Sequence, residues 1–236
     1  MIRRIITGFL LAGLATPFAV AKPLVAELFV SQNCEACPGA IKVMEEKASM
    51  SGSEMLLLTW SVDYWDYLGT ADPMALPVAA DRQRAYAENM EIRGPYTPQV
   101  VFNGETHCPG NRKKAVDREL EYHQESDASL IQIAFDENVQ AMTLGDTGIE
   151  LNAIVSLVHF KSVESESMML TNAVTKYEEI GKWDGSAKKF AVQCDGECAI
   201  LLQEAEYGEI IEAMRVPEAQ PNYVPVTDAP GLQPEQ

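Results

Sequence analysis

Basic side chains are scarce in this sequence, and their scarcity limits the partners that the protein can have. Its 236 residues include 18 Lys and Arg against 35 Asp and Glu, which gives a formal net charge of −17. A protein that binds nucleic acid or an anionic membrane surface needs clustered Lys and Arg to meet the phosphate groups. The composition therefore argues against both classes of partner. Such an acidic excess is more typical of solubility alone.

Long apolar runs are absent after the N-terminal segment. That segment has Arg3 and Arg4 near its start, an apolar stretch from Ile5 to Val20, and small residues up to Ala21. The stretch is shorter than the ~20 residues that cross a membrane, and the whole pattern is typical of a secretory signal peptide. We predict a signal peptide at 1–21, no membrane span after cleavage, and a periplasmic or secreted location. An uncleaved anchor is the alternative.

Cysteine is also rare, but two of the five cysteines, Cys34 and Cys37, form a Cys-x-x-Cys motif between a predicted strand and a predicted helix. The N-terminus of a helix stabilises a thiolate through its free N–H groups and its dipole. Two intervening residues allow the second thiol to attack a mixed disulfide formed on the first. In an oxidising compartment, this placement predicts a catalytic redox pair, with Cys34 as the attacking thiol and Cys37 as the resolving thiol.

Two other interpretations of this motif remain open. A Cys-x-x-Cys motif in an exported protein can also be a structural disulfide or half of a metal site. The chain has no second such motif and only three histidines, His107, His123 and His159. Because two thiolates leave Zn²⁺ short of its usual four ligands, we expect no metal site and no cofactor.

The order of the predicted elements indicates the fold class. In the first half, strands are predicted at 24–30, 55–61, 99–102 and 105–108, and helices at 40–49, 72–90 and 111–123. From Leu130 onward the predicted elements are strands, at 130–135, 148–160, 168–177, 188–194 and 198–204. Strands that alternate with helices favour a parallel sheet, and the turn at Asn103-Gly104 adds an antiparallel hairpin. We predict an α/β fold with a mostly β second part.

Pro98 directly precedes the predicted strand at 99–102. In a thioredoxin-like domain, a cis-proline before the third strand faces the Cys-x-x-Cys motif, and the residue before it can pair with an extended peptide. Only about 5% of X–Pro bonds are cis, so this assignment depends on the fold. We predict a cis Thr97–Pro98 bond against Cys34, with Pro98 in the catalytic site and with Thr97 and Tyr96 beside the substrate.

Aromatic and acidic residues are interleaved after the second predicted strand, at Asp63, Tyr64, Trp65 and Asp66. Adjacent residues of an extended chain face opposite sides, so Tyr64 and Trp65 cannot be buried in the same way. The functional interpretation is a substrate-binding rim in which Asp63 or Asp66 accepts a proton near the dithiol. The alternative is a turn in which an Asp caps a helix and the aromatic rings cover the edge of the sheet.

Arg82 and Tyr86 lie four residues apart in the predicted helix at 72–90, and therefore on one helical face. They are candidates for the same substrate-binding rim, where Arg82 would supply the counter-charge. A surface salt bridge is the more common role for such an arginine.

The remaining cysteines are Cys194, Cys198 and Cys108. Cys194 and Cys198 flank a three-residue turn that contains Asp-Gly, and the residues on both sides form predicted strands. Residues that close such a hairpin lie opposite each other, at about 4.5 Å between Cα atoms in a non-hydrogen-bonded pair. We predict a structural Cys194–Cys198 disulfide, with a second exchange centre as the alternative, and a buried free thiol at Cys108.

These motifs together resemble an exported family, the domain-of-unknown-function 1223 family. The resemblance rests on Glu27-Leu28-Phe29, Ser31-Gln32, Cys34, Cys37 and Pro38, Val62-Asp63-Tyr64-Trp65-Asp66, Leu68-Gly69, Arg82-Gln83, Tyr86, Tyr96-Thr97-Pro98-Gln99, Asn103-Gly104, Gly181-Lys182-Trp183-Asp184-Gly185 and Leu201-Leu202-Gln203. It implies a thioredoxin-like domain at 22–126, a β-rich domain at 127–216 and a redox role. The residues from 217 to 236, which are rich in proline, form a predicted tail. Thr70 departs from the family pattern, which has Trp there, and reduces the aromatic rim.

Three functions are compatible with these observations. The first is thiol–disulfide exchange with protein or small-molecule thiols and disulfides at Cys34 and Cys37. The second is the handling of a soft metal such as Cu(I) by the same two thiolates. The third is a non-catalytic periplasmic binding module that uses the aromatic rim, because a fold does not fix an activity. Exchange is the preferred hypothesis.

Overall fold

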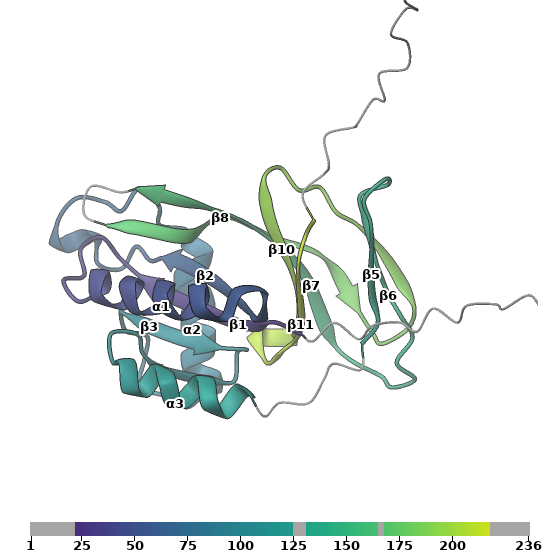
Figure 1. Cartoon of the computed structure of the whole chain (residues 1–236), viewed down its shortest axis with the longest axis horizontal. Helices are drawn as coiled ribbons and strands as arrows, with labels where there is room; N and C mark the ends of the chain where they lie inside the picture. The colour runs from purple at the N-terminus through teal and green to yellow at the C-terminus, as the bar shows by residue number, and fades with distance from the viewer. Residues whose placement is uncertain (1–21, 125–130, 165–167, 218–236) are drawn as a thin grey trace, which may run out of the picture.

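The structure is a computed structural model that describes residues 22–124, 131–164 and 168–217 (Figure 1). The predicted signal peptide, the predicted boundary at 126–127 and the tail from residue 218 lie outside these ranges. The helices are α1 (Cys37–Ser51), α2 (Pro77–Asn89) and α3 (Lys113–Gln124). The strands are β1 (Leu24–Val30), β2 (Met55–Ser61), β3 (Gln99–Phe102), β4 (Thr106–Pro109), β5 (Ile133–Asp136), β6 (Ala141–Leu144), β7 (Ala153–Glu164), β8 (Met169–Trp183), β9 (Lys188–Ala191), β10 (Glu197–Glu204) and β11 (Ile210–Arg215).

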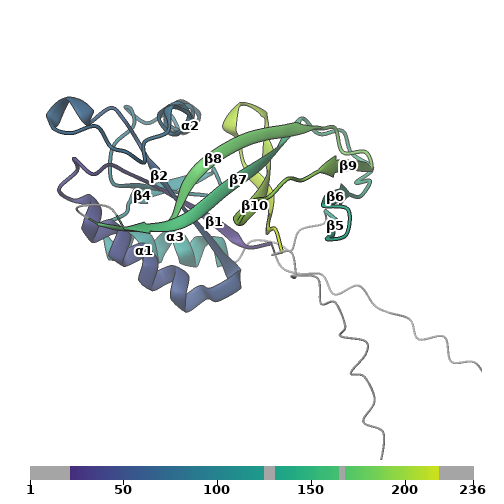
Figure 2. The same cartoon turned by 90° about the horizontal axis from the view of Figure 1, so that it is seen from above.

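Strands β1 and β2 pair in parallel along their whole length, from Leu24 opposite Met55 to Val30 opposite Ser61. Helix α2 lies on one face of this part of the sheet, and helices α1 and α3 lie on the other (Figure 2). Because both faces are covered, the two strands are mostly apolar and do not alternate, and Glu27, Thr59 and Ser61 are their polar residues. Every residue of β2 is buried, as are six of the seven residues of β1. The bounds of both strands are those predicted.

A hairpin extends this sheet on the β1 side. Strand β3 runs antiparallel to β1, and β4 runs antiparallel to β3. The turn between β3 and β4 has φ values of 47° at Asn103 and 74° at Gly104. These left-handed conformations are typical of a two-residue hairpin turn, which explains the Asn-Gly sequence. The peptide bond between Thr97 and Pro98, just before β3, is cis.

The second half of the chain continues the same sheet. The order of the eight strands is β11-β10-β7-β8-β2-β1-β3-β4, and one parallel pair, Thr59 opposite Ala173, joins β2 to β8. The expectation of a mixed α/β fold with a mostly β second part is confirmed. Strands β6 and β11 were not predicted, and β8 continues to Trp183, beyond its predicted end at 177.

A second sheet covers part of the first. Its three strands have the order β5-β6-β9, and they lie at the end of the molecule away from α1 (Figure 1). Side chains of β6 and β9, such as Met142 and Phe190, pack against Leu157 of β7 and Ile200 of β10. This packing buries the inner faces of both sheets. Among the described residues, no helix is long and apolar enough to cross a membrane.

Candidate redox site at the start of α1

Cys34 and Cys37 form a disulfide between the end of β1 and the first turn of α1. The backbone N–H of Cys37 donates a hydrogen bond to the carbonyl oxygen of Cys34 at 3.0 Å, and Pro38 lies in the first helical turn. Cys34 is 9% exposed, whereas Cys37 is completely buried. Cys34 is therefore the slightly more exposed residue of a largely buried pair.

The loop before Cys34 is held by the segment that follows the aromatic rim. The backbone N–H of Gln32 donates to the Asp72 carboxylate at 2.9 Å, and the side-chain amides of Gln32 and Asn33 donate to the carbonyl of Thr70. Asp72 in turn donates its backbone N–H to the Asp66 carboxylate at 3.0 Å. Asp66 therefore orders this loop. Gln32 and Asp72 were not singled out from the sequence, because loop-to-loop hydrogen bonds leave no local pattern.

Trp65 connects the aromatic segment to the loop that carries the cis-proline. Its indole N–H donates to the hydroxyl of Thr97 at 2.8 Å, and its ring stacks on Tyr67. Tyr67 is 78% exposed and Leu68 is 57% exposed. Asp63 is also exposed. The segment thus presents an acidic side chain and an apolar surface to solvent, whereas Pro98 itself is buried.

Tyr64 points to a second set of contacts, beneath the rim. Its hydroxyl donates to the side-chain oxygen of Gln83 at 3.0 Å, and burial raises the pKa of Tyr64 to about 12. The amide of Gln83 donates to the carbonyl of Tyr96 and to the side-chain oxygen of Gln99, both at 2.7 Å. Gln83 therefore joins the aromatic segment, helix α2 and the start of β3.

Arg82 and Tyr86 do not lie on the rim, and the expected surface salt bridge of Arg82 is wrong. Both side chains are completely buried. Arg82 donates from Nε and Nη2 to the two carboxylate oxygens of Glu27, at 2.7 and 3.0 Å. Tyr86 donates to the same carboxylate at 2.5 Å. The sequence could not indicate this because Glu27 lies in the apolar strand β1, 55 residues from Arg82.

Four aromatic rings surround the Arg82 guanidinium, at 5.1 to 5.7 Å from its carbon to the ring centres. The rings belong to Trp60, Tyr86, Tyr177 and Tyr207. Burial disfavours the charge, but the Glu27 carboxylate outweighs this effect and raises the pKa of Arg82. The charge is thus permanent, and it lies in the core between α2 and the sheet.

Tyr96 and His107 form a pair next to Cys108. The Tyr96 hydroxyl lies 2.8 Å from Nδ1 of His107. Burial raises the pKa values of Tyr96 and Cys108 to about 12 each, and it lowers the pKa of His107. Cys108 is a free, buried cysteine in the same apolar cluster as Cys34 and Cys37. Its thiol stays protonated at neutral pH.

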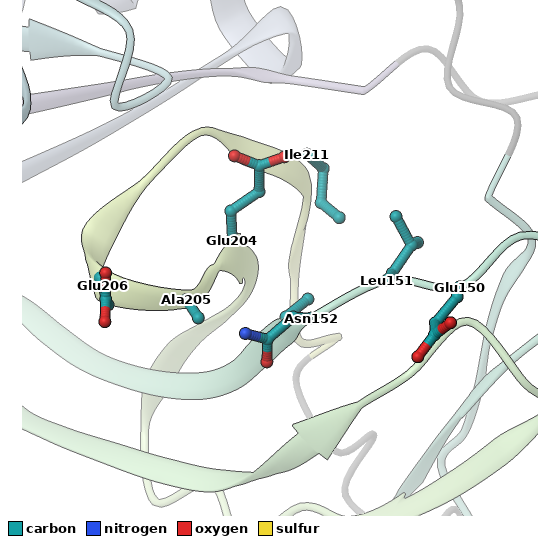
Figure 3. A pocket seen from close by; sticks show the side chains of 8 residues that line it. Glu150, Leu151, Asn152, Glu204, Ala205, Glu206 and Ile211 are labelled. Carbon is teal, nitrogen blue, oxygen red and sulfur yellow. The ribbon is translucent and has the colours of Figure 1, made fainter.

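Other candidate positions lie elsewhere. Cys194 and Cys198 are bonded to each other. A hollow in the second half is lined by Glu150, Asn152, Glu204 and Glu206 among others, and no sequence-predicted site residue lines it (Figure 3). In the described part of the chain, no group of three or more His, Cys, Asp or Glu side chains is arranged to hold a metal ion.

Solved structures of other proteins are similar to this chain. A crystal structure of a protein from Agrobacterium tumefaciens is 28% identical with a TM-score of 0.70, over 85% of this chain and 97% of that one. HBP35 of Porphyromonas gingivalis is 14% identical with a TM-score of 0.56, over 91% of this chain and 80% of that one, which is a likeness of fold alone. No curated protein is significantly similar. The model of the family described as "Protein of unknown function (DUF1223)" matches residues 25–203, so the chain belongs to this family.

Proposed function

We propose that the protein is an exported thiol–disulfide oxidoreductase whose active pair is Cys34 and Cys37. The observation that carries the proposal is the unequal exposure of the two cysteines at the start of α1, where Cys34 is 9% exposed and Cys37 is fully buried. An exchange pair needs one sulfur that a partner reaches and one that only the first sulfur reaches. A purely structural disulfide needs no such difference.

The architecture around the pair supports a thioredoxin-like domain at residues 22–126, followed by a β-rich domain at 127–216. Four neighbouring strands have the order β2-β1-β3-β4, with β1 and β2 parallel and β3 and β4 antiparallel to their neighbours. Helix α1 connects β1 to β2, α2 connects β2 to β3, and α3 follows β4. The signal peptide predicted at 1–21 supports export to the periplasm or beyond.

The exchange reaction needs only the pair and a substrate dithiol. A substrate thiolate attacks the sulfur of Cys34, the Cys34–Cys37 bond breaks, and Cys37 leaves with the electron pair and takes up a proton. A second substrate thiol then attacks the substrate sulfur of the mixed disulfide and releases Cys34 as a thiol. The substrate loses two electrons and two protons, and the protein gains them. The reverse sequence reduces a substrate disulfide.

Substrate binding is assigned to the surface formed by Thr97 and the aromatic segment. The Trp65–Thr97 hydrogen bond at 2.8 Å fixes this surface relative to the loop before β3. Asp63, Tyr64, Asp66 and Tyr96 flank or support it, whereas Arg82 and Tyr86 act only from the core. Exposed Tyr67 and Leu68 add apolar area that an extended peptide can cover.

Trapping of a mixed disulfide tests the proposal. In Cys37→Ser, we expect glutathione disulfide to leave glutathione bound to Cys34, because the resolving thiol is missing. In Cys34→Ser, we expect no adduct on Cys37, which is buried. Peptide mapping by mass spectrometry locates the adduct. Cys108→Ser is the matched control and should behave as the unmodified protein, because the thiol of Cys108 stays protonated at neutral pH.

Two outcomes would count against oxidoreductase function. Equal alkylation of Cys34 and Cys37 in the reduced native protein would remove the distinction between attacking and resolving thiols. Stoichiometric copper in the purified protein that is lost in Cys37→Ser would favour the soft-metal alternative.

A non-catalytic binding module is the second candidate, and the exposure of Tyr67 and Leu68 favours it. Such a module would bind extended peptides equally well after Cys34→Ser and Cys37→Ser together, and it would exchange no thiols. Peptide affinity of this double variant separates the two functions.

A further inference from the structure

The disulfide between Cys194 and Cys198 has a histidine beside it. Cys198, the second residue of β10, lies opposite His159 of β7, and its sulfur is 3.3 Å from Nδ1 of the imidazole. Cys198 is 1% exposed. Cys194 is only partly buried, in the turn before β10. Cys194 is therefore the more exposed residue of the pair, whereas the sulfur of Cys198 faces a titratable ring in the interior.

Glu178 of β8 orients this ring. Its carboxylate lies 3.2 Å from Nε2 of His159 and 2.7 Å from the ammonium group of Lys176. The hydrogen bond from Lys176, with that from His159, holds the pKa of Glu178 below its usual range. An ionised carboxylate accepts the Nε2–H of an imidazole, so Nδ1 is the ring nitrogen that faces the sulfur of Cys198. The Glu178 carboxylate, the His159 imidazole and the Cys198 sulfur thus contact one another in succession across β8, β7 and β10.

We propose that Cys194 and Cys198 form a second thiol-exchange site. The sulfur of Cys194 is attacked, and His159 supplies a proton to the sulfur of Cys198 when it leaves. The co-reactant is a small-molecule or protein thiol. The thiol of the co-reactant loses its proton to Nδ1 of His159, and the resulting thiolate bonds to Cys194. The Cys194–Cys198 bond breaks, and Cys198 leaves as a thiolate that takes this proton from the imidazolium. A second thiol attacks the sulfur of the co-reactant and releases Cys194. The co-reactant is oxidised to a disulfide, and its two protons end on the two cysteines.

The arrangement exceeds what a structural disulfide needs. A loop of only three intervening residues removes little entropy from the unfolded chain, so the bond stabilises the fold weakly. A leaving thiol departs faster when its thiolate is stabilised, and an adjacent imidazolium does this. The sequence alone suggested no such group, because His159 lies 39 residues before Cys198.

Other charges surround the site and enter its pH dependence. Glu197 precedes Cys198 on β10, and Asp195 lies in the turn. Arg215 of β11 pairs with Ala199, and burial lowers its pKa. Lys176 and Glu178 face the ring from β8. Of these groups, Glu178 is in direct contact with His159, so it governs the tautomer of the ring.

The test uses the full chain with Cys34→Ser and Cys37→Ser. The first pair then exchanges no thiols, so the result is independent of whether the proposed function of that pair is correct. Reduced glutathione is the probe, and the rate of opening of the Cys194–Cys198 bond is followed by alkylation and mass spectrometry. We expect His159→Gln to slow the reaction at least tenfold near neutral pH, within the range of acid–base catalysis. His123→Gln, whose ring bonds Thr106, is the matched control and should leave the rate unchanged.

Two further variants locate the attack. In Cys198→Ser, glutathione disulfide should place glutathione on Cys194. In Cys194→Ser, the ultraviolet absorbance of a thiolate should appear below the ordinary thiol range of about pH 8.5, and it should disappear when His159→Gln is added. An unchanged rate in His159→Gln with unchanged circular dichroism would overturn the proposal, as would equal labelling of the two sulfurs by glutathione. If Cys194→Ser does not fold, the kinetic comparison still decides.

Discussion

At the scale of single residues, two arginines of one helix differ in what their charges contribute to stability. Arg82 and Arg84 both lie in α2, two residues apart. Arg82 is fully buried against Glu27, whereas the pair between Arg84 and Asp81 is more than half exposed on both sides. Removal of one partner from a buried pair leaves the other charge without compensation, which is far more costly than loss of an exposed pair.

We therefore expect Arg82→Ala to lower the free energy of unfolding by about 3–5 kcal/mol. Arg84→Ala is the matched control and should cost no more than about 1 kcal/mol. Urea unfolding followed by circular dichroism measures both. Similar losses in the two variants would show that the Glu27 contact contributes little to stability.

At the scale of elements, the β3–β4 hairpin links the two halves of the chain through its turn. A Cβ atom added to Gly104 would lie 2.5 Å from the carbonyl oxygen of Gly208, in the loop before β11. The carbonyl of Asn103 also accepts a hydrogen bond from the N–H of Ile210, at 2.7 Å. The turn therefore needs glycine both for its left-handed backbone, with φ of 74°, and for this close approach.

Gly104→Ala is expected to destabilise the protein by at least about 1–3 kcal/mol, the usual cost of a left-handed residue with a side chain. Gly39 of α1 provides the control, because a Cβ atom there would meet nothing within 4 Å. Gly39→Ala should stabilise the helix by about 1 kcal/mol. Thermal unfolding of the two variants should thus shift in opposite directions, and equal shifts would contradict this account of the turn.

The elements that the sequence predicted are those with local signals. The strands at 24–30 and 55–61 are mostly apolar runs, and the hairpin has an Asn-Gly turn. Strand β6 is only four residues long, and β11 follows a loop with two residues in left-handed conformation, Glu206 and Tyr207. Strand β6 pairs with β5 and β9, and β11 pairs with β10 across that irregular loop. A four-residue strand is too short to show a clear alternation of apolar and polar residues, and a loop with non-glycine residues in left-handed conformation carries no common turn sequence.

The residues of the candidate site that the sequence predicted are likewise those with local signals. Cys34, Cys37 and Pro98 were identified because they form motifs next to predicted elements. The site roles of Gln32, Asp72 and Gln83 were missed, because the contacts of Gln32 and Gln83 join segments 13 to 40 residues apart. The burial of Arg82 was predicted wrongly, since helical spacing places a residue on a face but does not say what covers that face.

At the scale of the whole molecule, one sheet passes through both predicted domains. Gln203 of β10 donates to the hydroxyl of Tyr86 at 2.9 Å and thereby connects the second half to the buried Glu27–Arg82 pair. The apolar cluster around Trp60 likewise includes Val158, Ala199 and Leu201 from the second half. The two halves share one interior.

A shared interior predicts a single cooperative unfolding transition. Trp60 lies in β2 and Trp183 at the end of β8, and both are buried. Trp65→Phe with Trp183→Phe leaves Trp60 as the fluorescent reporter, and Trp65→Phe with Trp60→Phe leaves Trp183. In each of these two proteins, we expect the urea midpoint from fluorescence to equal the midpoint from circular dichroism. Two separate midpoints within one protein, by fluorescence and by circular dichroism, would indicate that the halves unfold independently.

The contact between Thr59 and Ala173 also has a consequence in time. During synthesis the chain emerges from its N-terminus, so Thr59 of β2 is made 114 residues before Ala173, its partner on the free edge of β2. Until then, an apolar strand with unpaired backbone groups is open to pairing with other chains. Long-range pairing of this kind is also slow, because the intervening loop must close first. The nascent protein therefore passes through an aggregation-prone stage that lasts until residue 173 is available, and a chaperone that shields β2 would act in this interval.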